Sequence, residues 1–133
     1  MQLHIEPAGS IPIYEQIVRQ VKFAVSNGAL QVGEHVPSVR ELAAQGAVNP
    51  NTVARAYREL QAAGILTSIR GTGLAVTPEA LQLCRNQRLE LVRERLRSVL
   101  EEALLNQIQP DELRQLLEAE LERLSHSNLT GTL

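Results

Sequence analysis

Residues 48–60, VNPNTVARAYREL, combine amide, hydroxyl and guanidinium side chains at helical spacing. At about 100° per residue, Asn51, Arg55 and Arg58 fall on one side of a helix. Amide and guanidinium groups near a helix N-terminus suit the base edges and phosphates of a DNA major groove. The alternative is an ordinary solvated helix face, and this stretch alone does not separate the two.

The same stretch contains the signals that begin and end a helix. Asn49 is a favourable N-cap, and Pro50 suits the first turn because its missing N–H would have no partner there. Gly64 marks the exit, so we predict a helix over residues 50–63. The opposite side of this helix is apolar and is expected to be buried; it carries Val53, Ala56, Tyr57 and Leu60.

Further elements are predicted ahead of this helix. Residues 13–27 carry apolar side chains at helical spacing and end at an Asn-Gly pair, which indicates a helix. Residues 2–5 before them are a candidate short strand. Residues 30–38, LQVGEHVPS, are expected to be an extended connector, because Pro37 disfavours helix at the residue before it.

A short helix is predicted to follow the connector. Ser38 with Glu41 three residues later forms a capping box, and the helix is expected to end after Ala44. Two helices joined by about four residues, the second of them capped and polar on its outer side, form a helix-turn-helix pattern.

After Gly64 the hydrophobic period changes from helical to alternating. Residues 65–69 and 74–76 flank the sequence RGTG, which predicts a hairpin with a glycine-rich tip. A hairpin directly behind a recognition helix is a wing, and Arg70 at its tip suits a minor groove or a phosphate strand. Alone this signal is weak, since most such turns only reverse the chain.

The remainder of the chain predicts two long helices, one beginning at residues 77–78 and broken at 109–111, the other following the break. Both carry leucine-rich stripes too wide for the two helices to bury between themselves. We expect a second copy of the chain to cover them; the alternative is a helical lid folded back on its own domain. The expected dimerisation residues are Leu89, Val92, Leu96, Val99, Leu100, Leu113, Leu117 and Leu121.

The order of these motifs resembles the winged helix-turn-helix domain of the GntR superfamily of bacterial transcription regulators. The matching stretches are PIYEQI, NGALQVGEHVPSVRELA, VNPNTVARAYRELQAAGIL and RGTGLAV, which cover residues 11–76 in unbroken order. The NPNT opening of the recognition helix and the short segment after the wing resemble the YtrA-like branch.

The resemblance implies DNA contacts from the second helix, the recognition helix and the wing, in agreement with the polar helix face. It places Tyr57 at a position used for packing. The candidate DNA-binding residues are Ser38, Arg40, Asn49, Asn51, Thr52, Arg55, Arg58, Arg70, Gly71, Thr72 and Gly73.

Two positions depart from the family pattern. Gly46 stands where the family usually has a large apolar residue between the two helices, which predicts a looser turn and a less stable domain. Leu74-Ala75 replaces the usual Thr-Phe after the wing glycines, so the wing strand is expected to be less well anchored than the helices.

The composition is that of an ordinary globular chain: 133 residues, 44% hydrophobic and 21% charged, with a formal net charge of −2. Any DNA affinity must therefore come from where the charges lie, since the total does not supply it. Without a long apolar run or a signal pattern, the sequence predicts a cytoplasmic protein with no membrane contact. Cys84 is the only cysteine and is expected to pack in the core.

No acid pair, activated nucleophile or phosphate loop appears at usable spacing, so an enzyme is not expected. No cofactor is predicted. No metal site is predicted either, although His35 and Cys84 leave a metal sensor open as an alternative to a surface histidine and a core cysteine.

The sequence thus predicts a mainly α fold with a small β-hairpin wing. Residues 1–77 would form the winged helix-turn-helix domain, residues 78–125 a two-helix dimerisation segment, and residues 126–133 a mobile tail. The expected function is that of a homodimeric repressor that binds double-stranded DNA at an inverted-repeat operator. The alternative is a winged-helix module used for protein–protein interaction. An unidentified small-molecule effector at the dimer seam, or regulation from elsewhere, is left open.

Overall fold

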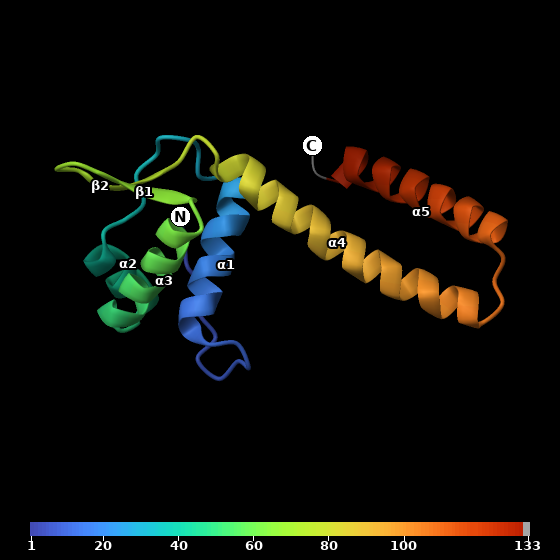
Figure 1. Cartoon of the computed structure of the whole chain (residues 1–133), viewed down its shortest axis with the longest axis horizontal. Coiled ribbons are helices and arrows are strands. Elements are labelled where there is room, and N and C mark those ends of the chain that lie inside the picture. The colour runs from blue at the N-terminus through green and yellow to red at the C-terminus, as the bar shows by residue number, and fades with distance from the viewer. Residues whose placement is uncertain (132–133) are drawn as a thin grey trace. The chain divides into compact units, whose positions relative to one another are not determined.

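The computed structural model describes residues 1–131, with side chains as far as residue 127. Within this part the chain forms a mainly helical fold with one antiparallel hairpin, as the sequence predicts, and contains two units, Met1–Arg88 and Leu89–Leu133 (Figure 1). The elements in chain order are α1 (Ile13–Ser26), α2 (Val39–Gly46), α3 (Pro50–Ala62), β1 (Leu66–Ile69), β2 (Gly73–Val76), α4 (Ala80–Leu105) and α5 (Pro110–Gly131).

The core of the first unit lies where α1, α2 and α3 pack together beside the hairpin (Figure 1). Each helix contributes the apolar side that its sequence predicts. The fully buried side chains include Ile17 and Val21 of α1, Leu42 of α2, and Val53 and Leu60 of α3. Burying the aliphatic side chains supplies the main stabilisation of the unit, at roughly 1.5–3 kcal/mol for each one.

The hairpin pairs Leu66 with Val76 at its base and Ile69 with Gly73 at its tip. The connector before α2 is extended, as predicted, and it also pairs with the free edge of β2. The Val36 N–H donates to the Leu74 carbonyl at 3.0 Å, and the Val76 N–H donates to the Glu34 carbonyl at 3.0 Å. The wing is therefore attached to the connector as well as to α3.

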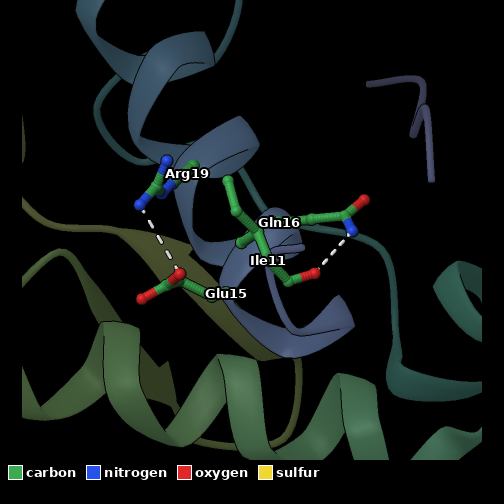
Figure 2. A network of polar contacts seen from close by, with 4 residues as sticks. All are labelled: Ile11, Glu15, Gln16 and Arg19. Carbon is green, nitrogen blue, oxygen red and sulfur yellow. Dashed lines mark hydrogen bonds and ion pairs between the residues drawn. The ribbon is translucent and has the colours of Figure 1, made fainter. Parts of the chain in front are cut away.

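The N-terminal residues differ from the prediction. Residues 2–5 form no strand; they belong to an arm, residues 1–11, that lies against α1. Side-chain amides of α1 take the place of a strand partner: Gln20 exchanges hydrogen bonds with both backbone groups of His4. Gln16 does the same for Glu6. Gln16 also donates to the carbonyl of Ile11, as Figure 2 shows. A glutamine amide has both a donor and an acceptor, so it satisfies an extended backbone as a strand would.

The boundary between the wing and α4 also differs. α4 begins at Ala80, because the Thr77 hydroxyl is not used as a helix cap; it donates to the Gly64 carbonyl at 2.6 Å and is buried. The first turns of α4 belong to the core of the first unit, where Ala80 and Cys84 are buried. Burial raises the pKa of the Cys84 thiol. This cysteine is therefore a packing residue, as expected.

The second unit contains the rest of α4 and α5, and the predicted break lies between them. Gln107 takes a left-handed conformation, with φ 64°, and α5 starts at Pro110 and runs back (Figure 1). α5 extends to Gly131, so residues 126–131 are helical where the sequence predicts a tail; the mobility of this segment stays a prediction, and residues 132–133 lie outside the described part.

Candidate nucleic-acid interface

The outward face of α3 carries the side chains that the sequence singled out. Asn51, Arg55 and Arg58 are exposed, while Tyr57 is buried on the opposite side. Thr52 is half-buried beside them. The helical wheel therefore predicted the two faces of α3 correctly.

Asn49 caps α3, as predicted. Its side-chain oxygen accepts a hydrogen bond of 2.8 Å from the Asn51 N–H, and Pro50 occupies the first turn. The N–H groups of Thr52 and Val53 both donate to the Asn49 carbonyl, at 3.0 and 3.3 Å, so this helix start favours an anion through the helix dipole rather than through free N–H groups. Within the described residues, the side-chain amide nitrogen of Asn49 has no hydrogen-bond partner.

Ser38 begins α2 with the predicted capping box. Its hydroxyl oxygen accepts from the Glu41 N–H at 3.1 Å, and the Glu41 carboxylate accepts from the Ser38 N–H at 3.1 Å. Hydrogen bonding of the Glu41 carboxylate by the Ser38 N–H, and then by the Ser38 side chain, lowers the pKa of Glu41. Arg40, two residues on, is exposed.

The wing tip consists of Arg70, Gly71, Thr72 and Gly73, all of them exposed. Gly71 and Gly73 have φ of 81° and 101°, in the left-handed region that side chains disfavour, so the tight turn requires glycine there. This turn presents the Arg70 side chain at the end of the hairpin.

His35 is a neighbour of the wing that sequence reasoning missed. Its Nε2 lies 3.0 Å from the Thr72 hydroxyl oxygen, and its backbone bridges to Ala75. The sequence does not indicate this contact, because it does not predict that the connector pairs with β2. His35 is exposed, as its interpretation as a surface residue requires.

The arginines of the candidate interface are available to a ligand. Within the described residues, no ion pair or side-chain hydrogen bond engages Arg40, Arg55, Arg58 or Arg70. Arg55 makes one aromatic contact, with its guanidinium carbon 3.7 Å from the centroid of the Tyr14 ring. Guanidinium groups without an internal partner can bind phosphates or guanine edges bidentately.

All of these residues belong to the first unit and come from α2, α3 and the wing. The unit also has an open pocket of about 310 Å³ between the arm and α1, with His4, Gln16 and Arg19 among its lining residues. Side-chain amides in its wall are already bonded to the arm (Figure 2). In the described part of the chain, no helix is long and apolar enough to cross a membrane, and no group of acidic, histidine or cysteine side chains is arranged to hold a metal ion.

The dimerisation residues expected from the sequence lie on α4 and α5. Among them only Leu113 is buried in the described chain, Leu100 is half-buried, and the others are exposed. Leu89, Val92 and Leu96 on α4, for example, are 56%, 50% and 41% exposed. Within the described residues, the second unit thus carries exposed apolar side chains along both α4 and α5.

Comparison with known proteins agrees with this geometry. Residues 13–76 match the family described as bacterial regulatory proteins, gntR family. The HTH-type transcriptional repressor YtrA of Bacillus subtilis is 38% identical over 98 residues, which are 74% of this chain and 75% of the relative.

Solved structures extend the likeness beyond the wing. A transcriptional regulator from Oenococcus oeni superposes with a TM-score of 0.76 and 29% identity, covering 88% of this chain and 97% of that one. YtrA from Sulfolobus acidocaldarius, a GntR-family transcription factor, has a TM-score of 0.56 and 30% identity over 79% of this chain and 99% of that one. The relatives are transcription regulators rather than enzymes. This chain belongs to the GntR family of DNA-binding transcriptional regulators and is similar to its YtrA members.

Proposed function

We propose that this chain is a homodimeric repressor that binds an inverted-repeat operator. The observation that carries the proposal is the exposed face of α3, where the side chains of Asn51, Arg55 and Arg58 have no polar partner within the described residues. This face shares a unit with a glycine-rich wing. The net charge of the chain, −2, does not indicate DNA binding. The positions of the unpaired arginines are therefore the better evidence for it.

The residues of the interface divide by the chemistry that each offers. Asn51 and Arg55 have planar donor groups suited to adenine and guanine edges in the major groove. We assign phosphate contacts to Ser38 and Arg40 at the start of α2 and to Arg58 further along α3. Such contacts position the domain on DNA without reading the base sequence. Arg70 and the Gly71–Gly73 tip are assigned to the phosphate strand or the minor groove beside it.

The apolar stripe of α4 and α5 supports a homodimer. Monomeric proteins rarely expose contiguous apolar patches of more than a few hundred Å², and the exposed leucines and valines recur along both helices. A second copy of the chain carries the same stripe, so a two-fold symmetric dimer would bury both stripes against each other. Two winged domains related by that axis would read half-sites separated by about 34 Å or a multiple of it.

The direction of regulation is inferred from a relative. YtrA of Bacillus subtilis is named as a repressor, and its match spans 98 residues, more than the 77 of the winged domain. A regulator that occupies its operator as a dimer can repress simply by excluding other proteins from it. A small-molecule effector would then act by changing the separation of the two winged domains, and the dimer seam is our candidate place for it.

The experiment is selection of the purified full chain against random and host DNA fragments at two salt concentrations, followed by sequencing. We expect an inverted repeat to be enriched, with affinity that falls steeply as salt rises because phosphate contacts release counterions. Enrichment of single half-sites would contradict the dimer. Enrichment of nothing by a folded protein would contradict operator binding and favour a protein-docking role for the winged domain.

A further inference from the structure

The guanidinium of Arg55 on α3 lies over the ring of Tyr14 on α1, with its carbon 3.7 Å from the ring centroid. Tyr14 is half-buried against the core, and Arg55 is exposed. The candidate DNA-binding residues predicted from the sequence include none from α1. The contact therefore joins a core helix to a residue of the candidate DNA-binding face.

We propose that Tyr14 is a positioning residue that holds Arg55 in the orientation required to read a base, so that α1 contributes to sequence specificity. The inference rests on the proposed function, since Arg55 must contact DNA for its orientation to matter. Tyr14 itself need not touch the DNA.

The geometry of the contact explains why a ring suits this task. A guanidinium stacked by its flat face keeps its N–H groups in the plane, pointing outward, so none of its donors is used by the ring. A carboxylate partner would orient the side chain equally well but would occupy the same donors that a guanine edge or a phosphate needs. Stacking thus reduces the freedom of a long side chain without reducing its hydrogen-bonding capacity.

No other group in the described chain performs this orientation. Arg55 has no ion pair there, and Glu15, the acid next to Tyr14, is engaged by Arg19 of the same helix at 3.5 Å (Figure 2). Arg58, one turn further along the exposed face of α3, has no aromatic ring beneath it. It is therefore a natural control for an arginine on the same face without this support.

Substitution of Tyr14 should change base preference more than general DNA affinity. A cation–π contact at an exposed site corresponds to a change of about two- to fivefold in an equilibrium constant. We expect Tyr14→Leu to lower discrimination at the base pair read by Arg55 by this factor, with binding to random DNA unchanged. Tyr14→Phe retains the ring and should behave as the wild type.

The test combines these variants with Arg55→Ala and Arg58→Ala in the full chain, using the selected operator and single-base variants of it. Unfolding is measured first, to establish that each protein is folded. In the Arg55→Ala background, Tyr14→Leu should have no further effect on base preference. In the Arg58→Ala background, it should have its full effect.

A measurement without DNA tests the contact itself. The ring current of Tyr14 should shift the Arg55 Nε–H proton resonance upfield in the free protein; Tyr14→Phe should preserve this shift, and Tyr14→Leu should abolish it. A wild-type resonance at the position of a free arginine would overturn the inference. So would loss of base preference in Tyr14→Phe, because the hydroxyl rather than the ring would then be responsible.

The failure of this inference is distinct from the failure of the proposed function. In one outcome, Arg55→Ala loses base preference but Tyr14→Leu keeps it. In another, Tyr14→Leu lowers base preference equally in the wild-type and Arg55→Ala backgrounds. Either outcome overturns only the role of Tyr14. If the wild-type protein shows no base preference at all, operator reading and the positioning role fail together.

Discussion

The hydroxyl of Tyr57 on α3 donates a hydrogen bond of 2.7 Å to the carbonyl oxygen of Pro37, the residue before the cap of α2. The tyrosine ring is buried in the core, and the bond reaches the last residues of the connector. One side chain thus links the recognition helix to the place where α2 begins. Arg40 and Arg55 lie on the two helices that this bond links.

Tyr57→Phe keeps the buried ring and removes only the donor. We expect the free energy of unfolding to fall by about 0.5–1.5 kcal/mol, because the Pro37 carbonyl loses its partner in a partly buried place. Urea titration measures this change. Tyr14→Phe is the matched control, since its hydroxyl has no hydrogen-bond partner within the described residues, and an equal loss in both variants would contradict the assignment.

The same phenol predicts a dependence on alkaline pH. Burial, and then the negative charge of Glu41, raise the pKa of Tyr57. The folded state therefore holds this proton more tightly than the unfolded chain, in which a tyrosine has a pKa of about 10. The resulting stability is fully present below that pH and is lost as the pH rises above it.

Tyr57→Phe has no proton to lose, so its free energy of unfolding should fall less than that of the wild type above a pH of about 10. Urea titrations of both proteins across this range provide the comparison. A constant difference between them at every pH would mean that the phenol ionises as easily in the folded state as in the unfolded chain.

Gly46 of α2 faces the N-terminal arm. A Cβ placed there would lie 3.2 Å from Leu3 Cδ1 and 3.7 Å from Ile5 Cγ1. The arm thus packs directly against the glycine and leaves little room for a larger residue at this position. Ala47, which follows it, closes the helix in the left-handed conformation, with φ 51°.

Gly46→Leu should therefore overpack this site and lower the free energy of unfolding by about 1–3 kcal/mol. Leu3→Ala should destabilise the wild type. In the Gly46→Leu background it should instead recover part of the lost stability, with an interaction energy in the double-mutant cycle of about 0.5–3 kcal/mol. The four proteins are compared by urea titration. Additive effects would show that Leu3 and residue 46 do not share the space.

The relation between Leu3 and Gly46 also illustrates what the sequence could predict. Periodicity and caps located α1, α2 and α3 to within about two residues, because local signals such as Ser38 with Glu41 fix helix ends. The arm was mistaken for a strand because its partners are the side chains of Gln16 and Gln20, and no local pattern marks a glutamine that binds a distant backbone.

In the candidate site, too, local features could be predicted from the sequence, and contacts between distant residues could not. The exposed face of α3 followed from the spacing of Asn51, Arg55 and Arg58 along one helix. The contacts of Tyr14 with Arg55 and of His35 with Thr72 join residues far apart in the chain, so they required the packing of α1 on α3 and of the connector on the wing.

Asn49 allows stability to be separated from DNA binding. Asn49→Ala removes the cap of α3 and should cost about 0.5–2 kcal/mol of unfolding free energy. Asn49→Asp retains a capping oxygen and adds a charge that the helix dipole favours, so its stability should match or exceed that of the wild type. The same charge would repel phosphates and lower DNA affinity.

Urea titration and operator affinity at two salt concentrations measure both properties for each Asn49 variant. Asn49→Ser is the neutral control and should keep stability and binding close to those of the wild type. If Asn49→Asp bound the operator as tightly as the wild type, the start of α3 would lie away from the phosphates, and the docking assigned to α3 would have to change.

Leu96 and Leu91 of α4 provide a matched test of the dimer. They have similar exposure, 41% and 38%, but Leu96 belongs to the stripe shared with Leu89 and Val92, whereas Leu91 falls on the opposite side of the helix. Leu96→Glu would bury a charge in a two-fold interface and meet its symmetry copy there, which is costly without a partner. Leu91→Glu would remain in solvent.

Light scattering of the full chain should therefore give twice the mass of one 14.7 kDa chain for the wild type and for Leu91→Glu, and the mass of a single chain for Leu96→Glu. Operator affinity should fall when the dimer is lost, because a single winged domain makes only half of the contacts. A dimeric Leu96→Glu would move the interface away from the stripe. A monomeric wild type would leave the helical lid as the explanation of these leucines, since the stripe must then be covered within one chain.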